Sequence, residues 1–176
     1  MYMRNEVIKL LTQLAKTGVA DYIQVREYLH LSNSKLLELE EKRLIESFNR
    51  TVNGRSKRIF VLGDTGATFC KTELGILFGC RVNLNQLAHD LLLTDVFYRC
   101  PLPIQNSWQH EGELVYEIRQ KYPNKTDVNC VDARVIVNGQ YIGIEARGKT
   151  YTEAYIEQKI RTAITYLNCI DVKIVD

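Results

Sequence analysis

The sequence predicts an α+β protein in two parts: a helical module that ends in a basic hairpin, and a small mixed sheet flanked by helices. The first prediction comes from three short amphipathic segments that precede a β-rich stretch within residues 4–62. The second comes from two β-branched runs that meet at Asn138-Gly139 and are followed by a helical pattern and an alternating strand pattern. Asn-Gly is a strong hairpin signal, because a type I′ turn needs φ > 0 at both central residues.

Length and composition favour a globular chain. The 176 residues, 45% of them hydrophobic, suit one domain or two small ones. No apolar run approaches the ~20 residues of a membrane span, and the start lacks the apolar segment of a signal peptide, so we expect a cytoplasmic protein with no membrane partner. The five cysteines are widely spread and never form a CxxC pair, which indicates reduced, mostly buried thiols.

The first part begins with three predicted helices. Apolar residues recur at helical spacing from Arg4 to Thr17, and Gly18 is a plausible stop. Asp21 can cap a second helix, and either Ser32 or Asn33 can cap a third. A hairpin with Asn-Gly at its tip follows over residues 46–62.

This arrangement over residues 1–62 resembles the winged helix-turn-helix domains of bacterial DNA-binding proteins. The region carries 11 basic and 7 acidic residues, which fits contact with DNA phosphates. The resemblance implies that double-stranded DNA is bound by the third helix and the wing, through Asn33, Ser34, Lys35, Lys42, Arg50, Arg55, Lys57 and Arg58. Glutamates on the third helix oppose such contact, and packing against a protein or a second copy is the alternative.

A helical connector is predicted over residues 63–100. Its start, Gly63 to Gly66, is polar and glycine-containing. Residues 64–78 and 84–98 show helical patterns, and the second is either a connector or a dimerisation element. Pro101 and Pro103 end it. The predicted domains are therefore 1–62, 63–100 and 101–176.

The third part centres on the Asn138-Gly139 hairpin. Residues 113–120 before it fit either a helix or a strand, whereas 151–167 has a helical pattern and 169–175 alternates like a strand. A two-residue turn pairs 137 with 140, 135 with 142, 133 with 144, and 132 with 145. One face is then apolar, and the other carries Asp132, Arg134, Glu145 and Arg147.

Two carboxylates directly across an antiparallel pair lie roughly 5 Å apart, which is unfavourable without a positive charge between them. A divalent metal or the two arginines could supply that charge. A four-residue loop over 138–141 would instead pair 132 with 147 and 134 with 145. The four charges would then form two opposite-charge pairs on an exposed sheet face.

The order of elements resembles the PD-(D/E)XK nuclease fold, a restriction-endonuclease-like mixed sheet with metal-binding acids on its central hairpin. The resemblance implies Asp132 and Glu145 as Mg²⁺ ligands, with Glu111 as a further acid. Arg147 stands where the pattern has lysine. Arginine can hold a phosphate but cannot act as a general base, so Lys149 or Lys159 would have to substitute.

The whole chain, with HDLLLTDVFY and the Trp108–Glu111 element before the hairpin, resembles the replication-relaxation proteins of plasmids and integrative elements. The resemblance implies DNA processing for a mobile element, in mobilisation or replication, with other DNA-processing proteins as partners. The nuclease-like domain would then be either degenerate or an active Mg²⁺-dependent nickase. A dimeric winged-helix repressor is a further alternative.

Overall fold

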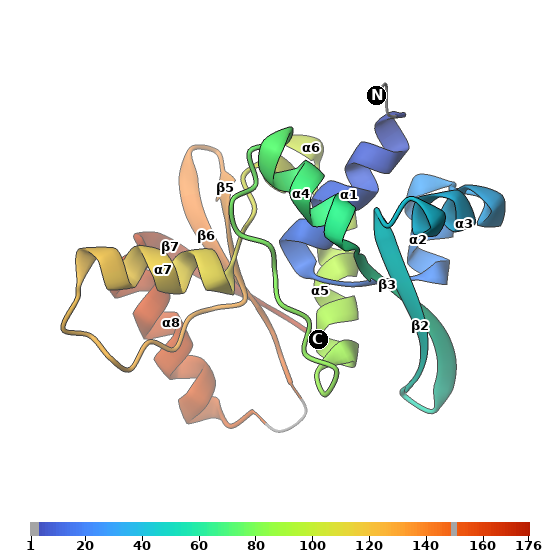
Figure 1. The fold of residues 1–176 in the computed structure, drawn as a ribbon. Helices are drawn as coiled ribbons and strands as arrows, with labels where there is room; N and C mark the ends of the chain where they lie inside the picture. Colours follow the sequence, from blue (N-terminus) through green and yellow to red (C-terminus); the bar gives the residue numbers. More distant parts are fainter. Residues whose placement is uncertain (1–3, 149–150) are drawn as a thin grey trace. The chain divides into compact units, whose positions relative to one another are not determined.

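The computed structural model describes residues 4–148 and 151–176, and it divides into two compact units, Met1–Arg99 and Cys100–Asp176. These described residues form eight helices and two sheets (Figure 1), which confirms the predicted mixture of helices and strands. Within the same residues, no helix combines the length and the apolar character needed to cross a membrane.

The first unit begins with α1 (Asn5–Thr17), β1 (Ala20–Asp21), α2 (Tyr22–Leu29) and α3 (Asn33–Glu41). The hairpin of β2 (Ile45–Val52) and β3 (Arg55–Leu62) follows, and the antiparallel sheet has the order β1-β3-β2. Helix ends lie close to their predicted positions because the capping signals are local. The Asp21 side chain accepts a hydrogen bond from the backbone N–H of Gln24, and the Ser32 side chain caps α3.

Residues 63–99 of the predicted connector belong to the first unit, and Cys100 belongs to the second. Helix α4 (Asp64–Thr72) is shorter than expected, and α5 (Leu87–Arg99) packs inside the unit. Leu87 and Leu91 are buried in a cluster that includes Val52 of the hairpin. Farther along α5, the Thr94 hydroxyl donates to the Val19 carbonyl at 2.6 Å. Apolar burial and polar bonds together fix α5 to this unit.

The second unit contains α6 (Leu102–Asn106), β4 (Gln109–His110), α7 (Glu111–Lys121), β5 (Ala133–Val137), β6 (Gln140–Ala146), α8 (Glu153–Leu167) and β7 (Cys169–Val175). Its sheet has the order β4-β5-β6-β7, in which only β6 and β7 run parallel. Residues 113–120, which fitted helix or strand, lie in α7. The His110 ring and the Glu113 carboxylate cap the start of that helix.

The hairpin of β5 and β6 has the predicted two-residue turn. Asn138 and Gly139 have φ values of 51° and 78°, as a type I′ turn requires. The pairs 137 with 140, 135 with 142 and 133 with 144 follow. The alternative four-residue loop is therefore wrong, because the turn chemistry sets the register of both strands.

Candidate functional site

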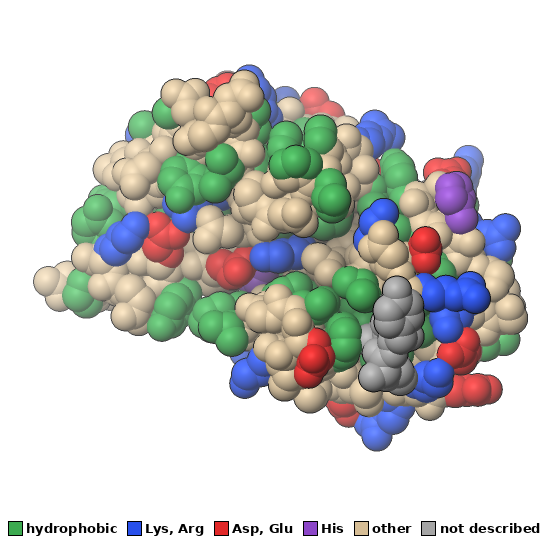
Figure 2. Space-filling model, turned by 90° about the horizontal axis from the view of Figure 1, so that it is seen from above, with side chains coloured by type: hydrophobic (Ala, Val, Ile, Leu, Met, Phe, Trp, Pro, Cys, Tyr) green, Lys and Arg blue, Asp and Glu red, His purple; other side chains and the backbone are tan. Residues whose placement is uncertain are grey.

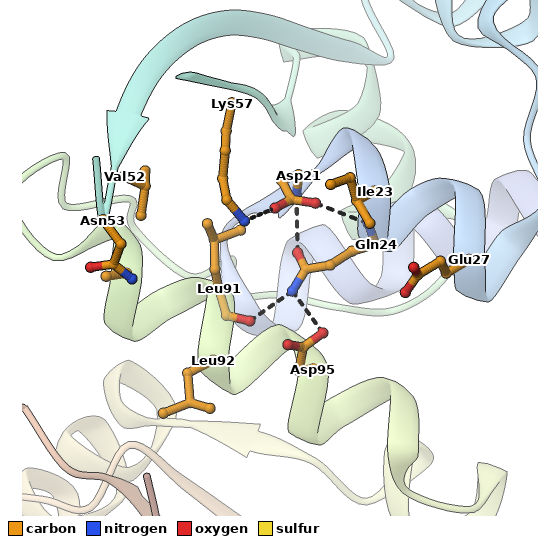
Figure 3. Close-up of a pocket in the computed structure, with 11 residues that line it drawn as sticks. Asp21, Ile23, Gln24, Glu27, Val52, Asn53, Lys57, Leu91, Leu92 and Asp95 are labelled. Atoms are coloured by element: carbon orange, nitrogen blue, oxygen red, sulfur yellow. Dashed lines mark hydrogen bonds and ion pairs between the residues drawn. The ribbon is translucent and has the colours of Figure 1, made fainter. Parts of the chain in front are cut away.

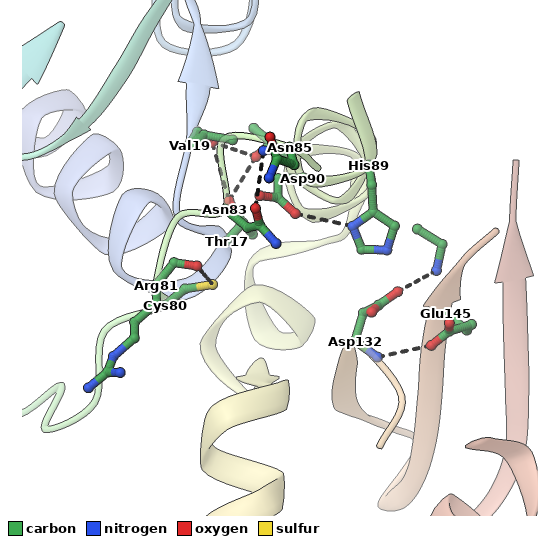
Figure 4. A network of polar contacts seen from close by, with 12 residues as sticks. Thr17, Val19, Cys80, Arg81, Asn83, Asn85, His89, Asp90, Asp132 and Glu145 are labelled. Carbon is green, nitrogen blue, oxygen red and sulfur yellow. Dashed lines mark hydrogen bonds and ion pairs between the residues drawn. The ribbon is translucent and has the colours of Figure 1, made fainter. Parts of the chain in front are cut away.

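The two predicted acids lie side by side at the open end of the hairpin (Figure 4). Asp132 directly precedes β5, and its backbone N–H donates to Oε2 of Glu145 at 3.2 Å. In return, the backbone N–H of Ala146 donates to Oδ2 of Asp132 at 2.7 Å. The register that the turn imposes has thus brought both carboxylates together, and each is held by a backbone N–H next to the other acid or of the other acid itself.

Lys159 of α8 supplies the positive charge. Its Nζ lies 2.7 Å and 2.9 Å from the two carboxylate oxygens of Glu145, and 3.3 Å from Oδ1 of Asp132. All three side chains are almost fully buried, with 3%, 0% and 6% of their surface exposed for Lys159, Glu145 and Asp132. Each of the four carboxylate oxygens therefore accepts a hydrogen bond from Lys159, a backbone N–H or both.

Helix α8 directs Lys159 inward because its neighbours on the same helical face are apolar. Ile156 and Ala163, three residues before and four residues after it, are buried as well. The Lys159 ammonium also lies 5.4 Å and 5.6 Å from the ring centroids of Tyr151 and Tyr155. These aromatic faces favour a cation at this place.

Burial and mutual repulsion perturb the ionisation of this cluster. Removal from water and the neighbouring Asp132 charge raise the pKa of Glu145 to about 7, despite the opposing effect of Lys159. Burial alone would lower the pKa of Lys159, but the charges of Asp132 and Glu145 outweigh it and raise that pKa. The raised pKa of Lys159 keeps the lysine charged, and the raised pKa of Glu145 favours its protonated form.

The donor set does not fit a magnesium ion as it stands. Mg²⁺ requires oxygen ligands in near-octahedral geometry, and the oxygens of Asp132 and Glu145 are already bonded to Lys159 and the backbone. Glu111, the predicted third ligand, is exposed at the start of α7, where its backbone N–H donates to the Asp132 carbonyl. Across residues 4–148 and 151–176, no group of three or more His, Cys, Asp and Glu side chains is arranged to hold a metal.

The structure does not show Arg147 or Lys149 bonded to the acid pair. Arg147 is exposed, and its backbone N–H donates to the Val175 carbonyl. Lys149 lies outside the residues that the structure describes. Lys159, which the sequence offered only as a substitute, is the cation that bonds to both acids. Its signal in the sequence is a lysine at an inward position of an amphipathic helix.

The expected exposed charge quartet is also wrong. Arg134 is buried at 3% exposure and bonds away from the acid pair, to Gln109, Glu117 and the carbonyl of Leu167. Its guanidinium also lies 4.2 Å from the centre of the Tyr141 ring. Arg134 therefore ties β4, α7 and α8 to the hairpin, and sequence spacing alone did not reveal those long-range partners.

Intramolecular ion pairs occupy half of the predicted DNA-contacting residues in the first unit. Lys35 and Lys42 both bond to Glu38, at 2.7 Å and 2.6 Å, and they lower the pKa of Glu38 to about 2. Arg58 bonds to Glu40 at 2.7 Å and to Asn33 at 3.0 Å. The basic charge next to α3 is thus largely neutralised, because its own glutamates accept it.

Lys57 is the fourth cation with an internal partner. It is half-buried beside a cavity of about 260 Å³ between the hairpin, α2 and α5, where it pairs with Asp21 (Figure 3). The side-chain amide of Gln24 in the same cavity donates to the Leu91 carbonyl at 2.8 Å and to the Asp95 carboxylate at 2.9 Å. The polar groups there hold α2, α5 and the hairpin together.

Arg50 and Arg55, by contrast, are exposed on either side of the hairpin tip. Asn33 and Ser34 are also exposed, at the start of α3. In the face seen in Figure 2, basic and acidic side chains are interspersed rather than gathered into a single basic surface. Of the eight predicted residues, the two hairpin arginines offer the clearest positive charge to a polyanion.

Comparisons with known proteins assign no family to this chain. No family model matches it, and no curated protein or solved structure matches it either. The function is therefore inferred from the residues and their geometry.

Proposed function

We propose that this protein binds double-stranded DNA through its first unit, and that its second unit is a nuclease-like domain that does not cut. The observation that carries the proposal is the tip of the β2–β3 hairpin, where Arg50 and Arg55 are both exposed. Arginines at such a tip neutralise phosphates, and contacts of this kind position a protein on DNA without reading its sequence.

The arrangement of the first unit supports this proposal. Three helices precede an antiparallel hairpin, and the short β1 adds to β3 on the side away from β2. This is the order of a winged helix-turn-helix, in which the third helix enters the major groove. Asn33 and Ser34 at the start of α3 would meet the bases, whereas the paired lysines of α3 add little charge.

The second unit supports the proposal that this nuclease-like domain does not cleave DNA. Its helix, hairpin, helix and strand follow the order expected for a PD-(D/E)XK-like domain, with the acids on the hairpin. The Lys159 ammonium bonds to both acids and takes up oxygens that a metal would need. Together with the resemblance to replication-relaxation proteins, this favours a role in gripping DNA of a mobile element rather than cleaving it.

Fluorescence anisotropy with a labelled duplex at several salt concentrations tests DNA binding. The Arg50→Ala/Arg55→Ala variant should bind more weakly, and the slope of log K against log salt should fall by about 2, near 0.9 for each phosphate that is no longer neutralised. The matched control is Lys35→Ala/Lys42→Ala, because both lysines already pair with Glu38. The proposal would be overturned if the parent protein did not bind the duplex, or if the two double variants bound it equally well.

Incubation of supercoiled plasmid with the protein and Mg²⁺ or Mn²⁺ tests the second unit. We expect no nicking above that of the Asp132→Ala variant. Metal-dependent nicking that disappears in Asp132→Ala would instead establish the nickase alternative and show that Lys159 moves away from the acids.

A further inference from the structure

The strand β7 forms one edge of the four-stranded sheet. Two of its isoleucines face solvent: Ile170 is 58% exposed and Ile174 is 37% exposed. An edge strand presents unpaired backbone groups, and exposed apolar residues beside them make it a ready partner for another strand.

The peptide groups of β7 alternate between its neighbour and the free edge. The Val175 carbonyl accepts a hydrogen bond from Arg147, which continues the ladder with β6. The register with β6 shifts between Tyr141 and Ile142, so Ile170 has no partner on β6 and regular alternation begins at Asp171. From there, alternation turns the peptide groups of Val172 and Ile174 toward the free edge. Consistent with this, the N–H of Val172 donates to the carboxylate of the adjacent Asp171 at 2.8 Å.

The residues of this edge are self-complementary. The segment from Ile170 to Ile174 reads I-D-V-K-I, with Val172 at its centre. An antiparallel pair centred on Val172 brings each Ile170, at the register shift of β7, near Ile174 of the partner subunit. Each Asp171 lies opposite Lys173 of the partner subunit, so both charged pairs are attractive.

We propose that two copies of this chain pair through their β7 strands, antiparallel and about a two-fold axis at Val172. The two sheets then join into one across the interface. Each Val172 N–H exchanges its bond with Asp171 for one with the partner's carbonyl, and the exposed isoleucines of the two copies come close together at the two ends of the pairing. Such a contact is isologous, as a closed dimer requires.

The charges also select the register. In the single chain, Lys173 and Asp171 pair with each other at 2.6 Å while 68% and 49% exposed. Exposed pairs of this kind contribute little, so exchanging them between copies costs little. A pairing centred on Asp171 or on Lys173 would instead oppose two like charges. Because residues 170–174 complement the same residues of a second copy, a second copy is a better partner for β7 than an unrelated strand.

Sedimentation velocity of the full chain over a range of concentrations tests the dimer. Asp171→Lys and Lys173→Asp should each weaken self-association about tenfold or more, because two like-charged pairs replace two attractive ones. An equimolar mixture of the two variants should form dimers again, because the charges of unlike copies then match. The Asp171→Lys/Lys173→Asp double variant should likewise recover the parent's association.

Ile174→Asp should also weaken association, whereas Ile136→Asp on β5 is the matched control, since Ile136 is equally apolar and 42% exposed. Emission from the buried Trp108 shows that each variant of the second unit is folded. A parent protein that stays monomeric, or single variants that remain monomeric when mixed, would overturn the proposal. The dimer does not depend on DNA binding, so the duplex experiments can fail without affecting it.

Discussion

The ammonium of Lys159 lies within 3 Å of both carboxylate oxygens of Glu145, although neither side chain is exposed by more than 3%. Buried charges are tolerated in proteins when they are paired and hydrogen-bonded. Here one lysine serves two acids, of which Asp132 directly precedes β5 and Glu145 lies on β6. The interior of the second unit therefore depends on a side chain from a helix that follows the hairpin.

Replacement of Lys159 by methionine should destabilise the second unit. The change leaves Asp132 and Glu145 buried without their cation, which costs about 3–5 kcal/mol for a buried pair that loses one partner. Trp108, the only tryptophan of the chain, is buried in this unit, so its fluorescence during urea unfolding reports on it alone.

Lys121→Met is the matched control for that substitution. Lys121 is 50% exposed and pairs with Glu117 across one turn of α7, so its loss should cost less than about 1 kcal/mol. Equal unfolding midpoints for the two variants would contradict the structural importance of Lys159.

The stability of the second unit should fall as pH rises from about 5 to about 8. The pKa of Glu145 is about 7 in the folded protein and 4.5 as its ordinary value, so the folded state binds more protons between these values. Glu145 therefore contributes stability below pH 4.5 that is lost as pH rises through 7, on the order of 3 kcal/mol.

Urea midpoints from Trp108 fluorescence at pH 5, 6, 7 and 8 measure this decline. Glu145→Gln cannot ionise and should show a much flatter profile. Glu157→Gln, an exposed position on α8, should keep the parent's decline. A parent midpoint that rises over this range would refute the assignment to Glu145.

Gly66→Ala should disrupt the first unit, because a Cβ there would lie 2.0 Å from the Leu44 carbonyl oxygen. The backbone at Leu44 cannot move aside as a flexible side chain can, so we expect the free energy of unfolding to fall by about 3 kcal/mol. Gly79→Ala is the control: its Cβ meets nothing within 4 Å, and its effect should stay within about 0.5 kcal/mol. Amide hydrogen exchange in α1 and α4 distinguishes the two variants. Equal protection of these helices in Gly66→Ala and Gly79→Ala would disprove the close contact.

Asp21→Ala should also weaken the first unit, by about 2 kcal/mol. Asp21 is 2% exposed, caps α2 and pairs with Lys57, so the change removes a cap and leaves a half-buried cation without its partner. Ser32→Ala removes only the exposed cap of α3 and should cost about 1 kcal/mol. Hydrogen exchange in α2 and α3 measures both, and an Asp21→Ala effect no larger than that of Ser32→Ala would count against the Lys57 contact.

The parts of the fold that sequence could predict are those set by neighbouring residues. Asp21 and Ser32 mark the helix starts through their own side chains, and Asn138-Gly139 sets the hairpin register through its positive φ values. The meeting of Asp132 and Glu145 follows from that register alone. These features depend on bonds within a few residues or across one turn.

The parts that sequence could not predict depend on distant partners. Thr94 and Leu91 gave no sign that α5 belongs to the first unit, because their partners lie near the chain's start and in the hairpin. Arg134 had the same charge as Arg147 in the sequence, yet one is buried and the other exposed. Which lysine would meet the acids depended on how α8 packs, and no pattern near the hairpin contains that information.

The order of the acid pair and its counter-ion along the chain also matters during synthesis. Glu145 leaves the ribosome 14 residues before Lys159, and Asp132 leaves 27 residues before it. Until α8 emerges, the hairpin carries two carboxylates that cannot be buried together. The nascent hairpin should therefore stay hydrated and unpacked, and the second unit should complete its interior only after α8 has been translated.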